Sequence, residues 1–144
     1  MMGNVDLDLL AKTYQNASTG IIAIKAVLDK TRNTELNTEL YKQLRDYQEL
    51  ADKSKKQLMA NGTKVKGQSL PRKAMMISSV KWNTLRHTSD SSIAQMVILG
   101  STMGVTQMTK LVHAKPNSDG MSMEVAKEFI RREEENIEVM KNFL

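Results

Sequence analysis

The sequence predicts an all-α protein built around four long helices. Three observations support this fold class. Apolar residues recur at alternating spacings of three and four in four segments, polar breaks separate those segments, and no useful stretch shows the apolar–polar alternation of a half-buried strand. The chain has 144 residues, of which 40% are hydrophobic and 26% charged. A chain of this size can bury a real core, so residues 1–144 are expected to form a single domain.

The first two helices are expected over residues 7–28 and 36–58. The apolar residues of each segment fall on one helix face, and Asp6 or Asn4 is suited to cap the first helix. Only the short polar break at residues 31–34 separates the two segments. A connection this short joins antiparallel neighbours, so the two segments form a helical hairpin.

Two further long helices are expected over residues 93–111 and 123–144, and they form a second hairpin. Residues 62–89 connect the hairpins, and Pro71 is suited to begin a short extra helix over residues 71–86. A crossover as long as the bundle between two antiparallel pairs is the ferritin-type topology. The alternative is an up-and-down bundle with a fifth helix packed outside.

Three segments stand out in the chain: Ser91-Ser-Ile-Ala-Gln-Met96, Gly100-Ser-Thr-Met-Gly-Val105 and Arg132-Glu-Glu-Glu-Asn-Ile137. With them the chain resembles small bacterial ferritin-like four-helix-bundle proteins of uncharacterised function. The resemblance extends over most of the chain in helix order and loop placement. It implies a ferritin-like bundle with a short extra helix in the long crossover, and the wider ferritin-like group often holds a pair of iron ions.

The residues themselves argue against an intact di-iron site. Such a site needs a Glu on each of two helices and Glu-x-x-His on each of the other two. Thr84 precedes His87 by three positions and Lys110 precedes His113 by three, so neither His completes the motif. We therefore expect no metal, no other cofactor and no catalytic residues. The inward middle positions carry one carboxylate among them: Ala17, Ile21, Tyr47, Ala51, Gly100, Gly104 and Glu133.

Glu133 leaves two interpretations open. It can lie at the edge of the helix seam and reach solvent, or it can be a buried carboxylate hydrogen-bonded by Tyr14 or Tyr47. A buried charge without a partner is costly, so the second interpretation requires one of these hydroxyl groups.

A basic stretch is a candidate anion-binding face. No acid lies between Asp52 and Asp90, although the chain carries a formal net charge of only +5. Lys and Arg neutralise phosphates, but Trp82 is the stretch's one aromatic residue for stacking on bases. We therefore expect at most weak binding of nucleic acid, and the acidic last helix is an alternative partner. The bases are Lys53, Lys55, Lys56, Lys64, Lys66, Arg72, Lys73, Lys81 and Arg86.

Three functions follow from these patterns. The first is a non-enzymatic ferritin-like bundle that acts as an interaction or structural protein and self-associates. The second is a module that binds nucleic acid or an acidic protein, and the third is a metal-binding bundle with a non-standard site. The 11 Met residues are expected to fill the helical core, and the absence of Cys excludes thiolate chemistry. No apolar run is long enough to span a membrane and the start lacks a basic signal region, so a cytoplasmic location is expected.

Overall fold

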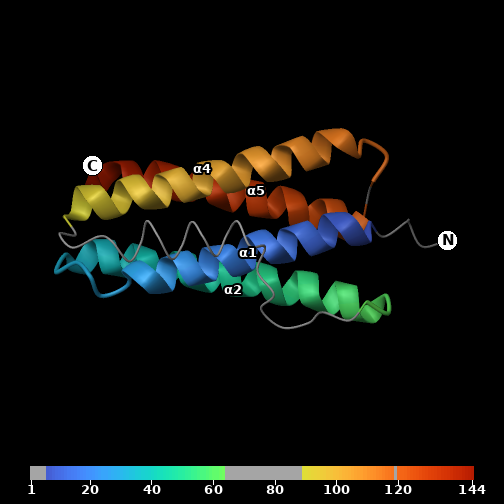
Figure 1. Ribbon diagram of the computed structural model, residues 1–144, viewed down its shortest axis with the longest axis horizontal. Helices are drawn as coiled ribbons and strands as arrows, with labels where there is room; N and C mark the ends of the chain where they lie inside the picture. Colours follow the sequence, from blue (N-terminus) through green and yellow to red (C-terminus); the bar gives the residue numbers. More distant parts are fainter. Residues whose placement is uncertain (1–5, 64–88, 119) are drawn as a thin grey trace.

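The computed structural model describes residues 6–63, 89–118 and 120–144, and these residues form a bundle of four α-helices (Figure 1). The described part of the chain contains no strand, which confirms the all-α prediction. The short helix expected over residues 71–86 lies outside the described residues. The helices are α1 (Leu7–Val27), α2 (Thr34–Ala60), α4 (Asp90–Ala114) and α5 (Gly120–Met140), and one 3-10 turn, η1 (Lys141–Phe143), follows α5.

Side-chain caps fix where three of the helices begin. Asp6, Asn33 and Ser89 each accept a hydrogen bond from the backbone N–H three residues further on, at 2.9, 3.1 and 3.1 Å. Each bond satisfies an N–H group that has no partner within the helix. The N-cap of α1 is therefore Asp6 rather than Asn4, which lies outside the described residues. Past the end of α2, Gly62 has a φ of 78°, a conformation that glycine adopts without strain.

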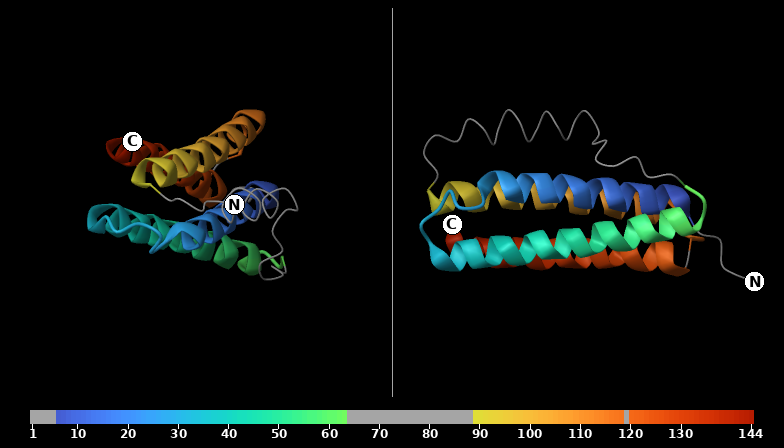
Figure 2. Two further views of the ribbon diagram at one scale, coloured as in Figure 1. Left: turned by 60° about the vertical axis from the view of Figure 1, so that its left-hand side comes forward. Right: turned by 90° about the horizontal axis from the view of Figure 1, so that it is seen from below.

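Contacts at the two ends of the bundle fix the direction of each helix. The hydroxyl of Thr31 and the side-chain amide of Asn33 donate to the carboxylate of Asp90, so the α1–α2 loop lies beside the start of α4. At the opposite end, the backbone N–H of Asp6 donates to Ser122 Oγ at 3.0 Å, so α1 begins beside α5. Helices α2 and α4 therefore run parallel, and each hairpin is antiparallel (Figure 2). The end of α2 and the start of α4 lie at opposite ends of the bundle.

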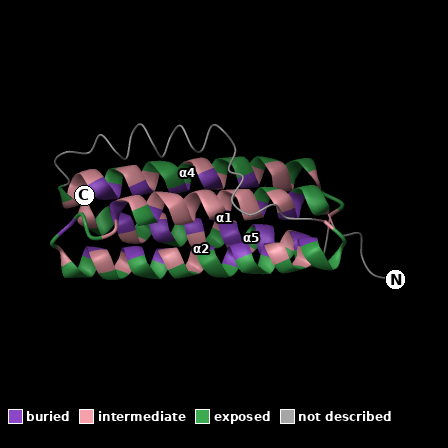
Figure 3. Cartoon of the chain, turned by 60° about the horizontal axis from the view of Figure 1, so that its bottom comes forward, coloured by how far each residue is buried: buried purple, intermediate pink, exposed green. Residues whose placement is uncertain are grey.

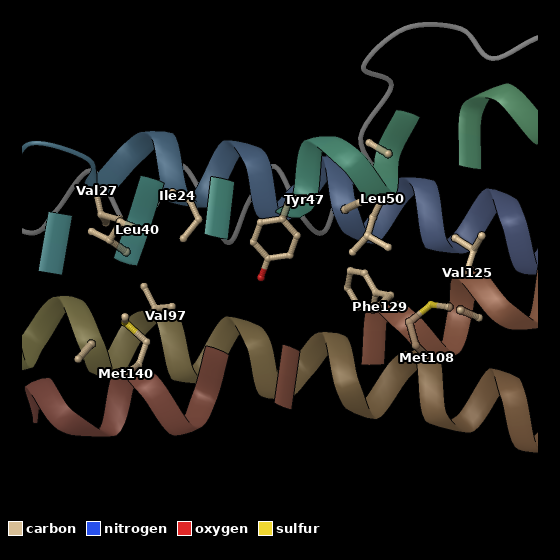
Figure 4. Close-up of a cluster of buried hydrophobic side chains, with 14 of the residues drawn as sticks. Ile24, Val27, Leu40, Tyr47, Leu50, Val97, Met108, Val125, Phe129 and Met140 are labelled. Atoms are coloured by element: carbon tan, nitrogen blue, oxygen red, sulfur yellow. The ribbon is translucent and has the colours of Figure 1, made fainter. Parts of the chain in front are cut away.

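The predicted apolar stripes meet in one core between the two hairpins (Figures 3 and 4). Its buried side chains come from all four helices and include Phe129 of α5 and Met108 of α4. The outer ends of the stripes lie closer to solvent, since Leu7 is 39% and Leu144 60% exposed. None of the helices in the described residues is long and apolar enough to cross a membrane.

The two glycines of α4 occupy different environments. Gly104 is buried, and a Cβ there would lie 2.9 Å from Glu133 Oε2. Gly100 was expected to face the core, but it is exposed, and no atom lies within 4 Å of the position of its Cβ. Residues four apart on a helix differ in direction by about 40°. Gly104 therefore faces α5, while Gly100 faces the space between α4 and α1.

This difference predicts opposite effects of substitution on stability. Gly104→Leu is expected to lower the free energy of unfolding by about 1–3 kcal/mol, because the side chain has no room beside Glu133 and Phe129. Gly100→Ala is expected to raise it by about 0.5–1 kcal/mol, because alanine favours the helix and meets no neighbour. Urea denaturation followed by circular dichroism measures both values. Equal losses in the two variants would contradict the assignment of these faces.

Candidate functional site

A groove of about 490 Å³ lies between α1 and α4. One face of each of these helices forms its walls, and side chains of α2 and α5 form its floor. The floor consists of Tyr47, Phe129 and Glu133, and the walls include the three glycines Gly20, Gly100 and Gly104. Most of the lining is apolar, so the polar groups that face the groove determine its chemistry.

Glycines bring the floor residues into place. A Cβ at Gly20 would lie 2.6 Å from the ring of Tyr47, so the ring packs directly on the backbone of α1. A Cβ at Gly104 would lie 2.9 Å from Glu133 Oε2 and 3.4 Å from the ring of Phe129. Both positions therefore require the absence of a side chain. Gly100 contributes in another way, because its missing side chain leaves the groove open.

Tyr47 and Glu133 form a hydrogen-bonded pair in the middle of the bundle. The Tyr47 hydroxyl donates to Glu133 Oε1. Tyr47 is 5% and Glu133 3% exposed. Figure 4 shows the tyrosine side chain extending from α2 toward the α4–α5 pair, with Phe129 nearby. The ring centroids of Tyr47 and Phe129 are 6.3 Å apart, which fixes the tyrosine ring as well as its hydroxyl.

Burial determines the protonation of this pair. Desolvation raises the pKa of Glu133 from 4.5 to about 8, although the hydrogen bond from the Tyr47 hydroxyl opposes the shift. Burial, and then the charge of Glu133, raise the pKa of Tyr47 well above 10. Near neutral pH both groups are therefore mainly protonated. The carboxyl group then accepts from Tyr47 at Oε1 and can donate from Oε2.

The polar atoms around the pair are incompletely satisfied. Ser101 is 2% exposed, lines the groove, and its Oγ makes no hydrogen bond to any described residue. Tyr47 donates to Glu133 Oε1, and Oε2 lies on the side of Gly104. Further polar atoms of Gln43 and Asn136 are also buried without partners. An unsatisfied buried polar group costs about 1–3 kcal/mol, so Ser101 offers a hydrogen bond that a molecule in the groove can use.

Two of the three residues proposed for a buried polar site lie together in the structure. It brings Tyr47 and Glu133 together, and Glu133 does not reach solvent at the helix seam. Tyr14 packs partly buried against the core and makes no hydrogen bond to Glu133 among the described residues. Sequence reasoning missed Ser101 and Gly20. A serine next to Gly100 on the apolar face of α4 was the available signal for Ser101.

The beginning of the basic stretch pairs with the acidic helix α5. Lys53 Nζ lies 3.2 Å from Glu128 Oε2, and Arg132 bridges Glu128 and Asp46 at 2.8 and 2.9 Å. The exposed Lys53 pair contributes little to stability, but it reduces the charge available to an anion. Lys55 and Lys56 also lie on α2. The remaining predicted bases lie outside the described residues: Lys64, Lys66, Arg72, Lys73, Lys81 and Arg86.

Within residues 6–63, 89–118 and 120–144, no group of three or more His, Asp or Glu side chains is arranged to hold a metal ion. Glu133 is the carboxylate buried at the centre, and its neighbours there are Tyr47, Ser101 and the backbone of Gly104. A phenol, a hydroxyl and one protonated carboxyl group are a poor ligand set for a transition metal, which needs several deprotonated carboxylates or imidazoles.

The raised pKa of Glu133 predicts a pH-dependent stability. The folded protein holds this proton more tightly than the unfolded chain, so this contribution is complete below pH 4.5 and is lost as pH rises through about 8. Between these values the free energy of unfolding falls by about 1.4 kcal/mol per pH unit. Glu133→Gln removes this dependence and keeps the hydrogen bond from Tyr47. Urea titrations from pH 5 to 9 should therefore show a falling difference between wild type and variant, and a constant difference would contradict the assignment.

A second prediction concerns metal content. Protein purified aerobically is expected to carry no stoichiometric iron, manganese or zinc, because no suitable ligand set is formed by the described residues. Elemental analysis of the purified protein measures this directly. One tightly bound transition-metal ion per chain would contradict it and would direct attention to His87, Asp90 and His113.

Comparison with known proteins relates the chain to a fold. The sequence matches no known family and no curated protein. The structure is similar to the crystal structure of a DUF305 fragment from Deinococcus radiodurans, with a TM-score of 0.76. The match covers 94% of this chain and 92% of that chain at 10% sequence identity. At this identity the similarity shows a shared helical fold.

Proposed function

We propose that the protein is a non-enzymatic helical bundle that binds a small, mainly apolar molecule in the groove between α1 and α4. The observation that carries this proposal is Ser101 Oγ on the groove surface, beside the buried carboxyl group of Glu133. Both residues are buried and line the groove, and Ser101 Oγ has no hydrogen-bond partner among the described residues. A ligand with one hydroxyl or carbonyl group can supply that partner.

The size and lining of the groove support a ligand of modest size. Small-molecule sites in proteins usually have volumes of about 300–1,000 Å³, mostly apolar walls and a few polar groups that fix orientation. The groove has about 490 Å³ and this kind of lining. On α1 it extends from Lys12 to Ile24, a length of about 18 Å at 1.5 Å per residue. An elongated molecule therefore fits better than a compact one.

We also propose that the bundle is ferritin-like, on the basis of its topology. Two antiparallel hairpins are joined by one connection between opposite ends of the bundle, as in ferritin-like folds. In those folds the centre of the bundle holds metal-binding carboxylates. Here Tyr47, Gly104 and Glu133 occupy the centre, which supports a binding role in place of di-iron chemistry.

A variant that fills the groove tests this function. Gly100→Leu places a side chain in open space within the groove, so it blocks the site without disturbing the core. Thr102→Leu is the matched control, because Thr102 is exposed on the same helix and does not line the groove. Calorimetric titration with 1-decanol is expected to show saturable binding of one molecule per chain, and Gly100→Leu is expected to weaken it at least tenfold.

Two results would contradict the proposal. One is the absence of saturable binding to wild-type protein across a series of linear and aromatic alcohols. The other is equal binding by wild type and Gly100→Leu, which would place the bound molecule elsewhere. Thr102→Leu should bind as wild type does, and a loss in this control would show that the surface substitution acts through the fold.

A further inference from the structure

We infer that the ligand of the groove is an elongated amphiphile with one anionic end group, which Lys12 and Lys110 hold at one end of the groove. This inference rests on the proposed function and adds the chemical class of the ligand. It follows from the position of the two lysines, from their lack of acidic partners and from the charge of the groove as a whole.

The two lysines come from opposite walls. Lys12 lies on α1 and Lys110 on α4, and both line the groove with exposed side chains. The side-chain amide of Asn16 donates to the sulfur of Met108 at 3.5 Å, which places these turns of α1 and α4 side by side. Lys12 is one turn before Asn16, and Lys110 follows Met108 by two residues. Because the helices are antiparallel, both lysines lie at the same end of the groove.

Neither lysine has an acidic partner in the described part of the chain. Asp8 precedes Lys12 by four residues, a spacing that often gives an ion pair on a helix. Asp8 instead pairs with Lys115, at 3.4 Å, and Lys115 also pairs with Asp6 at 3.0 Å. The acids near this end of the groove are therefore engaged by Lys115. Lys12 and Lys110 are left with charges that a bound anion can neutralise.

The charge of the groove favours an anion over a cation. Its lining contains two lysines and one carboxyl group, Glu133. Glu133 is buried and mainly protonated near neutral pH, so the lysines supply the positive charges and no full negative charge opposes them. A cationic amphiphile would be repelled at the lysine end. A monoanion gains attraction there without placing its charge in the apolar part of the groove.

The apolar chain of the ligand extends from the lysines toward Ser101. Lys110 and Ser101 are nine residues apart on α4, which corresponds to about 13 Å along the helix axis. The apolar lining between them includes Met103, Gly104 and Met108. A linear apolar chain that begins at the lysines therefore lies over these apolar residues of the groove, in the direction of Ser101 and Glu133.

Titration with three ten-carbon probes of different head group tests the inference. Decanoate, 1-decanol and decylamine share one apolar body, and the full-length protein is titrated with each below its micelle concentration at pH 7. Decanoate is expected to bind about tenfold more tightly than 1-decanol, and decylamine more weakly than both. The variant Lys12→Met/Lys110→Met should remove the advantage of decanoate, a loss of about tenfold, and change the affinity for 1-decanol much less.

The control is Lys25→Met/Lys42→Met, which removes two exposed lysines that do not line the groove. It lowers the net charge of the protein equally and should bind decanoate as wild type does. Tighter binding of decylamine, or a loss of decanoate affinity in the control as large as in the test variant, would overturn the inference. Binding of 1-decanol with no preference for decanoate would do the same but leave the proposed function intact. Failure of all three probes to bind would overturn the proposed function itself.

Discussion

The hydrogen bond from Tyr47 to Glu133 is the interaction on which the centre of this structure depends. A carboxyl group buried in a helical core is stable only if its polar atoms are paired or it gives up its charge. Here both conditions contribute, because the tyrosine hydroxyl pairs with Oε1 and burial raises the pKa to about 8. The pair also explains two glycines. The tyrosine ring occupies the space beside Gly20, and the carboxyl group occupies the space beside Gly104.

The groove is a consequence of the same packing. Gly20 on α1 and Gly104 on α4 leave room for Tyr47 and Glu133 between the hairpins. The missing side chain of Gly100 leaves the groove beside them open. The floor of the groove is thereby polar but uncharged near neutral pH, whereas its lysine end is positive. In the function that we propose, the lysines attract the charged group of a ligand and the floor contacts its uncharged part. Above pH 8 the ionised Glu133 would oppose an anion, so the proposed binding and the stability would depend on the same proton.

Sequence patterns predicted the four long helices, the two hairpins and most of the core. They did so because the spacing of apolar residues and the cap at Asp6 are local signals. Whether a given glycine is buried or exposed was less predictable. Gly100 and Gly104 share one face in the pattern, but only the packing of Glu133 and Phe129 shows which of them is covered. The two interpretations of Glu133 also remained open, because the choice depends on a tyrosine 86 residues away. The groove could not be predicted, since it is a gap between helices rather than a pattern in either.

The most direct test of the central claim is the protonation of Glu133 itself. The carboxyl carbon of glutamate reports its ionisation in nuclear magnetic resonance, and comparison with Glu133→Gln assigns the signal. A titration from pH 4 to 10 should show this carboxyl group losing its proton with a midpoint near pH 8. The midpoint should rise further in Tyr47→Phe, because this variant lacks the hydroxyl that stabilises the ionised form. A midpoint near 4.5, unaffected by Tyr47→Phe, would show that Glu133 is solvated and unpaired and would contradict this account.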